Sequence, residues 1–216
     1  NWWYNEIGVP KTLGPAFIML KDELSETEMK EAVGVLDNSH FRMTGQNKVW
    51  LAGNIFYKAV LTNNRELAQR ARDTIASEIK ITTNEGIQPD FSFHQHGPQQ
   101  QFGNYGLAFI TGMAFWGRMF NGTHLAFDEE QKAILRNLFY NGYNWINWKG
   151  YFDVNSLGRQ FFKDAQVNKS LAAGYAAADM IVTDPAHKQM YLDFISRNFS
   201  GASKSHFNVD RHFWRS

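Results

Sequence analysis

Residues 48–79 read KVWLAGNIFYKAVLTNNRELAQRARDTIASEI and set the fold class of this chain. Apolar side chains recur every three or four positions over 48–61 and again over 65–79, which is the spacing of one face of an α-helix. Asn63 and Asn64 separate the two patterns and are typical of a turn and a helix cap. The stretch therefore predicts two amphipathic helices joined by a tight turn, which is a helical hairpin.

The same arrangement recurs in further pairs of helical patterns along the chain. One pair contains an S-x-x-E capping box, in which Ser25 and Glu28 satisfy backbone donors at a helix start. Alternation typical of strands is nearly absent, with 151–155 and 206–209 as short exceptions. The additional pairs are residues 12–21 with 26–36, 105–120 with 128–145, and 170–181 with 185–198.

Successive hairpins predict an all-α fold, an α/α toroid or solenoid, formed by a single domain over residues 1–216. No Gly/Ser-rich linker or low-complexity run divides the chain. In an array of hairpins the long connections collect on one face, and the two unusual ones here are 82–104 and 149–168. We expect a ligand groove on that face.

Composition argues against several classes of function. The formal net charge of +1 gives no bulk attraction to nucleic acid, and no apolar run approaches the roughly 20 residues of a membrane span. Without cysteine there is no disulfide and no thiolate metal site. Aromatic residues make up 15% of the chain, which is high, so we expect both an aromatic-rich core and rings that stack on sugars.

The most unusual polar segment is FHQHGPQQQFGNYG, residues 93–106. It combines two imidazoles, four glutamines, an asparagine and a phenol with helix-breaking glycine and proline, and it contains no charged residue. Ordinary surface loops carry charged side chains that water solvates readily. This composition therefore indicates a site that hydrogen-bonds a polar ligand.

His96 and Tyr105 are nine positions apart in this segment, with glycine and proline between them to turn the chain. An imidazole can take or share a proton near neutral pH, whereas a phenol needs a neighbouring cation before it acts as a base. Arg159 is the candidate cation. Spacing alone favours a plainer interpretation, in which Tyr105 begins a helix with a half-buried ring and His96 is a hydrogen-bonded loop residue.

Asn47 and Gln99 are candidate amide donors toward a carboxylate or a developing oxyanion. Asn47 stands just ahead of an amphipathic helical pattern, where a cap or turn role is the usual interpretation. Paired carboxylates for glycoside hydrolysis would come from Asp90, Asp153 and Asp164, but no spacing selects two of them.

No metal site is predicted. His94 and His96 form an H-x-H pair, but no third ligand stands at a recognisable spacing and no H-E-x-x-H motif occurs. His206 and His212 are distant along the chain. Isolated histidines are more often ordinary hydrogen-bonding residues than ligands.

Four motifs, in order along the chain, together resemble polysaccharide lyase family 8, which includes chondroitin AC lyases, hyaluronate lyases and xanthan lyases. The resemblance covers nearly the whole chain, and residues 95–112 look most like the chondroitin AC lyases. The motifs are Asn1-Trp2-Trp3 with Glu6-Ile7-Gly8-Val9-Pro10, Thr44-Gly45-x-Asn47, Gln95-His96-Gly97-Pro98-Gln99 leading to Tyr105-Gly106, and Asn155-x-x-Gly158-Arg159.

The resemblance implies an incomplete α/α toroid whose groove binds an acidic polysaccharide and cleaves it by β-elimination, with no water added and no cofactor. By the family pattern Asn47, with His96 nearby, hydrogen-bonds the carboxylate of a uronate and makes its C5 proton more acidic. Tyr105, activated by Arg159 and His96, takes that proton and returns one to the departing O4 oxygen. In an alternative assignment His96 is the base and Tyr105 only the acid.

Four residues are expected to contact the substrate. Trp2 and Trp3 resemble the family's aromatic patch that stacks on sugar rings, although a core role for one of them is about as well founded. Gln99 is an amide contact. Lys163 stands where chondroitin AC lyases tend to have a second arginine, so its contact with sulfate or carboxylate is less directional.

The family's toroid is followed by β-sandwich domains that supply a glutamate to the site and close one side of the groove. The chain stops at Ser216 before such domains, so we expect a fragment that lacks them. Family and polymer size imply a secreted or periplasmic protein. The rival interpretations are a glycoside hydrolase on the same toroid and a carbohydrate-binding domain without turnover.

Overall fold

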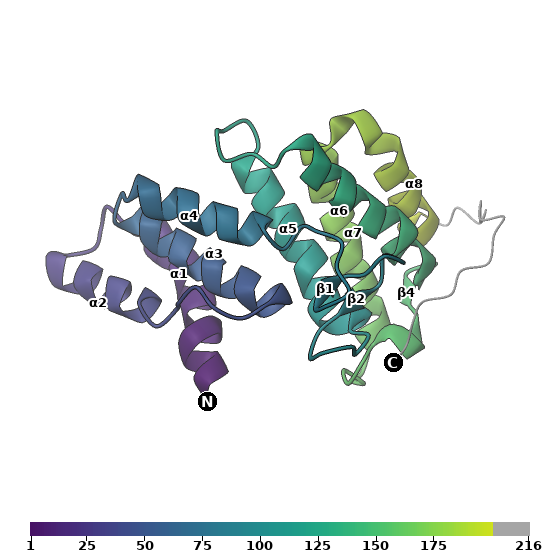
Figure 1. The fold of residues 1–216 in the computed structure, drawn as a ribbon, viewed down its shortest axis with the longest axis horizontal. Coiled ribbons are helices and arrows are strands. Elements are labelled where there is room, and N and C mark those ends of the chain that lie inside the picture. Colours follow the sequence, from purple (N-terminus) through teal and green to yellow (C-terminus); the bar gives the residue numbers. More distant parts are fainter. Residues whose placement is uncertain (201–216) are drawn as a thin grey trace. The chain divides into compact units, whose positions relative to one another are not determined.

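The computed structural model describes residues 1–200, and within that range the regular elements are almost entirely helical (Figure 1). Two short antiparallel pairs of strands accompany the helices, β1 (Gly86–Ile87) with β2 (Phe93–His94) and β3 (Asn147–Trp148) with β4 (Tyr151–Phe152). The all-α fold class is confirmed. The helices are α1 (Val9–Met19), α2 (Glu26–Leu36), α3 (Gly45–Leu61), α4 (Arg65–Ala76), α5 (Leu107–Phe120), α6 (Glu129–Asn141), α7 (Ala165–Thr183) and α8 (Lys188–Phe199).

The predicted extended segment 206–209 lies outside the described residues, as do His206 and His212. The chain divides into two compact units, Asn1–Glu78 and Ile79–Ser216. The single domain over 1–216 stays a prediction.

The N-terminal unit is built on the packing of α3 against α4 and α1. Its core contains Leu36 and Leu61, with Tyr57 packed against them. The predicted capping box of α2 is present, because the Ser25 hydroxyl accepts from the Glu28 N–H and the Glu28 carboxylate accepts from the Ser25 N–H at 2.9 Å. Helix α2 therefore begins and ends at the predicted residues.

A π-helix, Tyr4–Gly8, precedes α1, so helix begins well before the predicted residues 12–21. The buried side-chain amide of Asn54 in α3 holds this π-helix in place. It donates to the Ile7 carbonyl at 3.2 Å and to the Ser39 hydroxyl at 3.0 Å. The Ser39 hydroxyl in turn donates to the Glu6 carbonyl at 2.6 Å. A local sequence pattern does not predict such long-range hydrogen bonds, so it does not predict this helix start.

The C-terminal unit is centred on α7, which packs against α5 and α8. The sequence pairs α5 with the next helix, α6, but in the structure α5 packs mainly against α7. Buried aromatic rings dominate this core, which accounts for much of the high aromatic content. Ring centroids are 4.9, 5.4 and 4.8 Å apart in the pairs Phe93–Phe109, Phe102–Tyr143 and Phe139–Phe194.

The helical pattern predicted over 128–145 is interrupted at Gly142. A Cβ at this position would lie 2.5 Å from the Leu138 carbonyl oxygen and 2.6 Å from the Phe91 carbonyl oxygen, so no side chain fits. Helix α6 ends before this glycine, and a 3-10 turn, Tyr143–Trp145, follows it.

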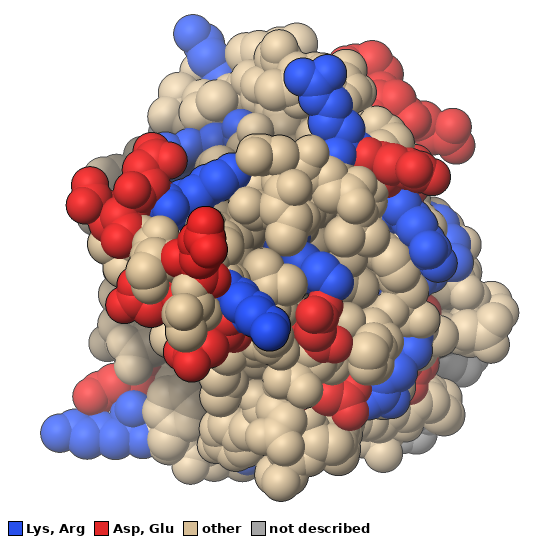
Figure 2. All heavy atoms as spheres, turned by 90° about the vertical axis from the view of Figure 1, so that its left-hand side faces the viewer, with Lys and Arg blue, Asp and Glu red and all other residues tan. Residues whose placement is uncertain are grey.

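Charged side chains of both signs are interspersed on the face drawn in Figure 2, with uncharged surface between them. This distribution agrees with a formal net charge of +1. No helix among residues 1–200 is long and apolar enough to cross a lipid bilayer.

A buried carboxylate at the end of α7 joins three helical segments. Asp184 accepts from Arg136 of α6 at 2.8 Å, from the His187 ring at 2.8 Å, and from the Tyr191 hydroxyl of α8 at 3.2 Å. Burial by itself raises the pKa of Asp184, but the hydrogen bonds and charges of Arg136 and His187 outweigh it and hold that pKa below its ordinary value. The carboxylate is therefore ionised in the folded protein at neutral pH.

Substituting Arg136→Met should destabilise the protein by about 3 kcal/mol, because it leaves a buried carboxylate without its main partner. The matched control is Arg118→Met, which removes an ion pair to Asp179 whose arginine is 60% exposed, and it should cost less than about 1 kcal/mol. Urea unfolding at pH 7 measures both free energies. Equal losses of unfolding free energy in the two variants would show that the buried network stabilises the protein no more than a surface ion pair does.

The same network predicts that the free energy of unfolding depends on pH. Because the folded state lowers the pKa of Asp184 below 3.8, its contribution to the free energy of unfolding is full above about pH 5 and is lost as the pH falls through the lowered pKa. The stability difference between the wild type and Arg136→Met should therefore shrink between about pH 5 and pH 3. A difference that stays constant over this range contradicts the assignment.

Candidate active site

The polar loop after β2 is closed by its own backbone and held by an acidic side chain. The N–H of Gln95 donates to the Gln99 carbonyl at 3.1 Å. Glu85 accepts from the Gly97 N–H at 2.9 Å and also from the Gln95 side-chain amide. Sequence reasoning did not identify Glu85, because nothing in its local pattern indicates which loop it reaches.

His96 lies at the exposed tip of this loop with a φ of 61°, a left-handed conformation that is uncommon for a residue with a side chain. Its ring meets the Tyr105 ring edge to face, with centroids 4.8 Å apart and an interplanar angle of 86°. Tyr105 is 8% exposed. The structure thus brings together two of the predicted residues, an imidazole and a phenol, and their catalytic role stays a prediction.

Tyr105 belongs to a π-helix, Phe102–Gly106, that leads into α5. The Gly106 N–H donates to the Gln101 carbonyl five residues earlier at 2.9 Å, and the buried hydroxyl of Tyr143 donates to the Phe102 carbonyl at 3.3 Å. Burial raises the pKa of Tyr143 well above its usual range, so this phenol remains a donor. Helical turns of this rare type occur frequently at functional sites.

Two glycines allow the π-helix to pack closely against its surroundings. A Cβ on Gly103 would overlap the Ser156 carbonyl oxygen and lie 3.0 Å from the Leu157 Cα. A Cβ on Gly106 would lie 2.8 Å from the Phe93 Cβ and 2.9 Å from the Tyr143 hydroxyl. The backbone of this segment therefore depends on glycine at both positions.

The segment that precedes Arg159 packs on the same π-helix. Gly158 has a φ of 64°, and a Cβ there would lie 3.3 Å from the Gln101 side-chain oxygen and 3.8 Å from the Asn104 Cβ. Arg159 follows directly, with an exposed side chain, and Lys163 is exposed four residues later. The second long connection thus reaches the helix that carries Tyr105, as the sequence predicted for this pair of loops.

Asn47 belongs to the N-terminal unit and lies in the first turn of α3, whose cap is Thr44. Its side chain is nearly buried, and among the described residues its Oδ1 has no hydrogen-bond partner. The helix start itself is satisfied by buried Glu78, which accepts from the Gly45 N–H at 2.8 Å and pairs with Lys48 at 2.9 Å. A buried acceptor without a partner needs an explanation, and a ligand that donates a hydrogen bond to it is one.

The two tryptophans have different environments. Trp2 is 45% exposed, and the Arg42 guanidinium lies over its ring at 5.2 Å from the centroid. Trp3 is partly buried, packs edge to face on Trp50 at 5.8 Å, and covers Gly8 so closely that a Cβ there would lie 2.8 Å from its ring. Trp3 has a packing role, and Trp2 has exposed ring surface.

Gln99 and two of the candidate aspartates make local hydrogen bonds. The Gln99 side chain is exposed and accepts from the Gln101 amide at 3.3 Å. Asp90 accepts from the Ser92 N–H at 2.9 Å, and Asp153 accepts from the Ser156 hydroxyl at 3.0 Å. These aspartates stabilise turns, as expected for residues that no catalytic spacing selects.

The two histidines of the H-x-H pair lie in different environments. His94 is buried on β2, and its Nε2 has no hydrogen-bond partner among residues 1–200, whereas His96 is exposed at the tip of the loop. In this part of the chain no group of three or more His, Cys, Asp or Glu side chains is arranged to hold a metal ion.

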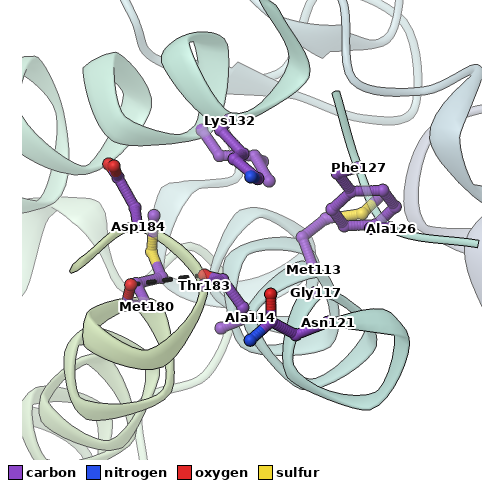
Figure 3. Close-up of a pocket in the computed structure, with 11 residues that line it drawn as sticks. Met113, Ala114, Gly117, Asn121, Ala126, Phe127, Lys132, Met180, Thr183 and Asp184 are labelled. Atoms are coloured by element: carbon purple, nitrogen blue, oxygen red, sulfur yellow. Dashed lines mark hydrogen bonds between the residues drawn. The ribbon is translucent and has the colours of Figure 1, made fainter. Parts of the chain in front are cut away.

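A small pocket between α5, α6 and α7 is lined by none of the candidate site residues (Figure 3). Its volume is about 10 Å³, room for roughly one water molecule, so it holds no sugar. Its polar lining includes Asn121, Lys132, Thr183 and Asp184, and the Thr183 hydroxyl is already bonded to the Met180 carbonyl at 3.2 Å.

The chain belongs to polysaccharide lyase family 8, because residues 1–197 match the model of that family's N-terminal α-helical domain. Chondroitinase-AC of Pedobacter heparinus is 30% identical over 205 residues, which cover 93% of this chain and 29% of that protein. Xanthan lyase of Bacillus sp. strain GL1 is 22% identical over 183 residues, covering 82% of this chain and 20% of that protein.

Solved structures agree. A chondroitinase AC lyase superimposes with a TM-score of 0.84 at 28% identity, covering 94% of this chain and 31% of the other. A Paenibacillus xanthan lyase gives a TM-score of 0.78 at 18% identity, covering 99% and 24%. These likenesses confirm the predicted all-α fold class, that of the family's N-terminal α-helical domain. The chain spans about 30% of the length of its chondroitinase relatives.

Substituting Gly103→Ala should destabilise the C-terminal unit by about 2–3 kcal/mol, because the added methyl group overlaps backbone atoms that cannot yield. Gly34→Ala is the matched control, since Gly34 lies within α2 with no atom within 4 Å of an added Cβ, and it should stabilise by about 0.5–1 kcal/mol. Thermal and urea unfolding compare the two. A tolerated alanine at position 103 would refute the close packing described for the π-helix.

Proposed function

We propose that this chain is the helical catalytic domain of a lyase that cleaves an acidic glycosaminoglycan, of the chondroitin or hyaluronan type, by β-elimination at a uronate residue. Membership of polysaccharide lyase family 8 and 30% identity to a chondroitinase-AC support the reaction class. The observation that carries the proposal is the contact of the His96 and Tyr105 rings at 4.8 Å in the polar loop.

The chemical difficulty is the weak acidity of the C5 hydrogen of a uronate. As this carbon loses its proton, negative charge accumulates on the attached carboxylate, and a donor that neutralises the carboxylate lowers the barrier. Asn47 and His96 take this role. The nearly buried amide of Asn47 in the first turn of α3 supports it, because a side-chain amide can donate a hydrogen bond to a carboxylate.

Proton transfer then falls to Tyr105. As a phenolate it removes the C5 proton, the electron pair of the broken C–H bond forms the C4–C5 double bond, and the C4–O4 bond breaks. The departing O4 oxygen receives a proton from the same phenol, so no water is consumed and an unsaturated uronate remains. Arg159 and His96 stabilise the phenolate. For a proton on the opposite face, His96 serves as base and Tyr105 as acid.

Three exposed side chains complete the substrate contacts. Trp2 offers a ring face for stacking, Gln99 an amide, and Lys163 a cation for sulfate or carboxylate. A lysine ammonium binds as a point charge and gives less directional contact than the forked guanidinium of arginine. Trp3 contributes through packing.

The rest of the proposal concerns the whole protein. The chondroitinase relatives are about three times as long as this chain, which supports β-sandwich domains that follow the helical domain and close the groove. A substrate of polymer size supports a secreted or periplasmic location.

The test incubates the chain, by itself and within the full-length protein, with chondroitin and with hyaluronan. Elimination gives a conjugated product that absorbs in the ultraviolet. Tyr105→Phe should lower kcat by at least about a hundredfold. The matched control Tyr175→Phe removes a hydroxyl from a side chain that is 73% exposed on α7, and it should leave kcat unchanged.

Two results would contradict the proposal. New reducing ends without ultraviolet absorbance indicate hydrolysis and favour a glycoside hydrolase. Binding of the polymer without turnover, with the same affinity in Tyr105→Phe, favours a carbohydrate-binding domain.

A further inference from the structure

Lys169, in the first turns of α7, is a buried cation that the catalytic scheme does not use. Its side chain is 6% exposed. Its ammonium donates to the carbonyl oxygen of Gly103, 66 residues away in sequence, and to the side-chain oxygen of Gln160. The Phe162 ring lies on a further side, with its centroid 5.9 Å from the Nζ atom.

This environment is unusual for a lysine. A buried ammonium is normally paired with a carboxylate, but among the described residues Lys169 has only neutral acceptors and an aromatic ring around it. Burial accordingly lowers its pKa. The charge costs stability at this position, so its hydrogen bonds need a structural or functional reason.

Each acceptor is close in sequence to a candidate catalytic residue, one to the phenol Tyr105 and the other to the cation Arg159. Gly103 stands two residues before Tyr105 in the π-helix, and Gln160 directly follows Arg159. Helix α7 itself is anchored, because Gln166 donates to the Phe152 carbonyl of β4 at 2.8 Å. One ammonium therefore joins a fixed helix to both segments.

We propose that Lys169 is a positioning residue, whose ammonium clamps the loop of residues 156–162 onto the π-helix Phe102–Gly106. The clamp limits where the Arg159 side chain can reach. Its consequence for turnover rests on the proposed function, in which Arg159 must lie near the Tyr105 oxygen. The clamp itself is a property of the fold and is tested without substrate.

Limited trypsin digestion of the native chain tests the clamp, since Arg159 is an exposed cleavage site inside the loop. Lys169→Met removes both hydrogen bonds and keeps an apolar stem. Cleavage after Arg159 should accelerate about tenfold or more relative to cleavage after Lys149, an exposed site in the turn between β3 and β4 that Lys169 does not touch. Mass spectrometry of the early fragments gives both rates.

Two controls separate the clamp from general effects. Lys169→Arg retains a cation with several donors and should restore most of the protection of Arg159. Lys188→Met removes an exposed lysine at the start of α8 and should leave both cleavage rates unchanged. If Lys169→Met does not fold, Lys169→Gln is measured instead, since its shorter side chain also loses the bridge but leaves a polar group.

The inference is overturned if cleavage after Arg159 proceeds at the wild-type rate in the folded variant, or if cleavage after Lys149 accelerates by the same factor. Where the elimination assay reports turnover, Lys169→Met should lower kcat by about ten- to a hundredfold with KM within about twofold, because orientation is lost and binding is kept. Loss of protection in Lys169→Met without a fall in kcat retains the clamp and rejects its catalytic consequence. Loss of protection without turnover in any variant retains the clamp and rejects the lyase.

Discussion

The candidate site depends on the close approach of backbone to the five-residue π-helix at 102–106. Only glycine fits at positions 103 and 106. A Cβ at position 103 would overlap the backbone of residues 156–157, and one at position 106 would crowd the Phe93 Cβ and the Tyr143 hydroxyl. The Gln101 carbonyl accepts the N–H of the fifth residue after it, which turns Tyr105 out of the ordinary register of α5. Without this packing the phenol would follow the α-helical spacing and lie elsewhere relative to the His96 ring.

Around that helix, and elsewhere in the chain, buried charges are satisfied in different ways. Asp184 has a full set of opposite charge and hydroxyl partners and joins helices of the core. Glu78 pairs with Lys48 and also accepts the first N–H of α3, so it replaces a cap. Lys169 alone among these three has only neutral partners, and both of its acceptors belong to segments that carry candidate catalytic residues. Burying a charge is costly, and under the proposed positioning role of Lys169 that cost holds the two segments together.

Local physics made much of this molecule predictable. Helix α2 has the predicted limits because its capping box and its apolar spacing both lie within a few residues. Glycine and proline between His96 and Tyr105 let the chain turn, but the contact of their rings also depends on the long-range packing of the π-helix. The π-helix, the Glu85 contact and the Lys169 clamp were not predictable, because each depends on atoms brought from far along the chain. Asn47 and Arg159 were candidates from residue type alone, with a cap or turn role the usual interpretation of Asn47, and the resemblance to a family gave both a specific role.

The most direct measurement of the central claim is a crystal structure of the Tyr105→Phe protein with a bound uronate oligosaccharide. The account predicts that the C5 hydrogen of one uronate points at the position of the missing hydroxyl, with C5 within about 3.5 Å of it, and that the carboxylate of the same sugar accepts from the Asn47 amide. A uronate bound with its carboxylate away from Asn47, or with C5 facing neither the His96 ring nor the substituted ring, would contradict the elimination scheme.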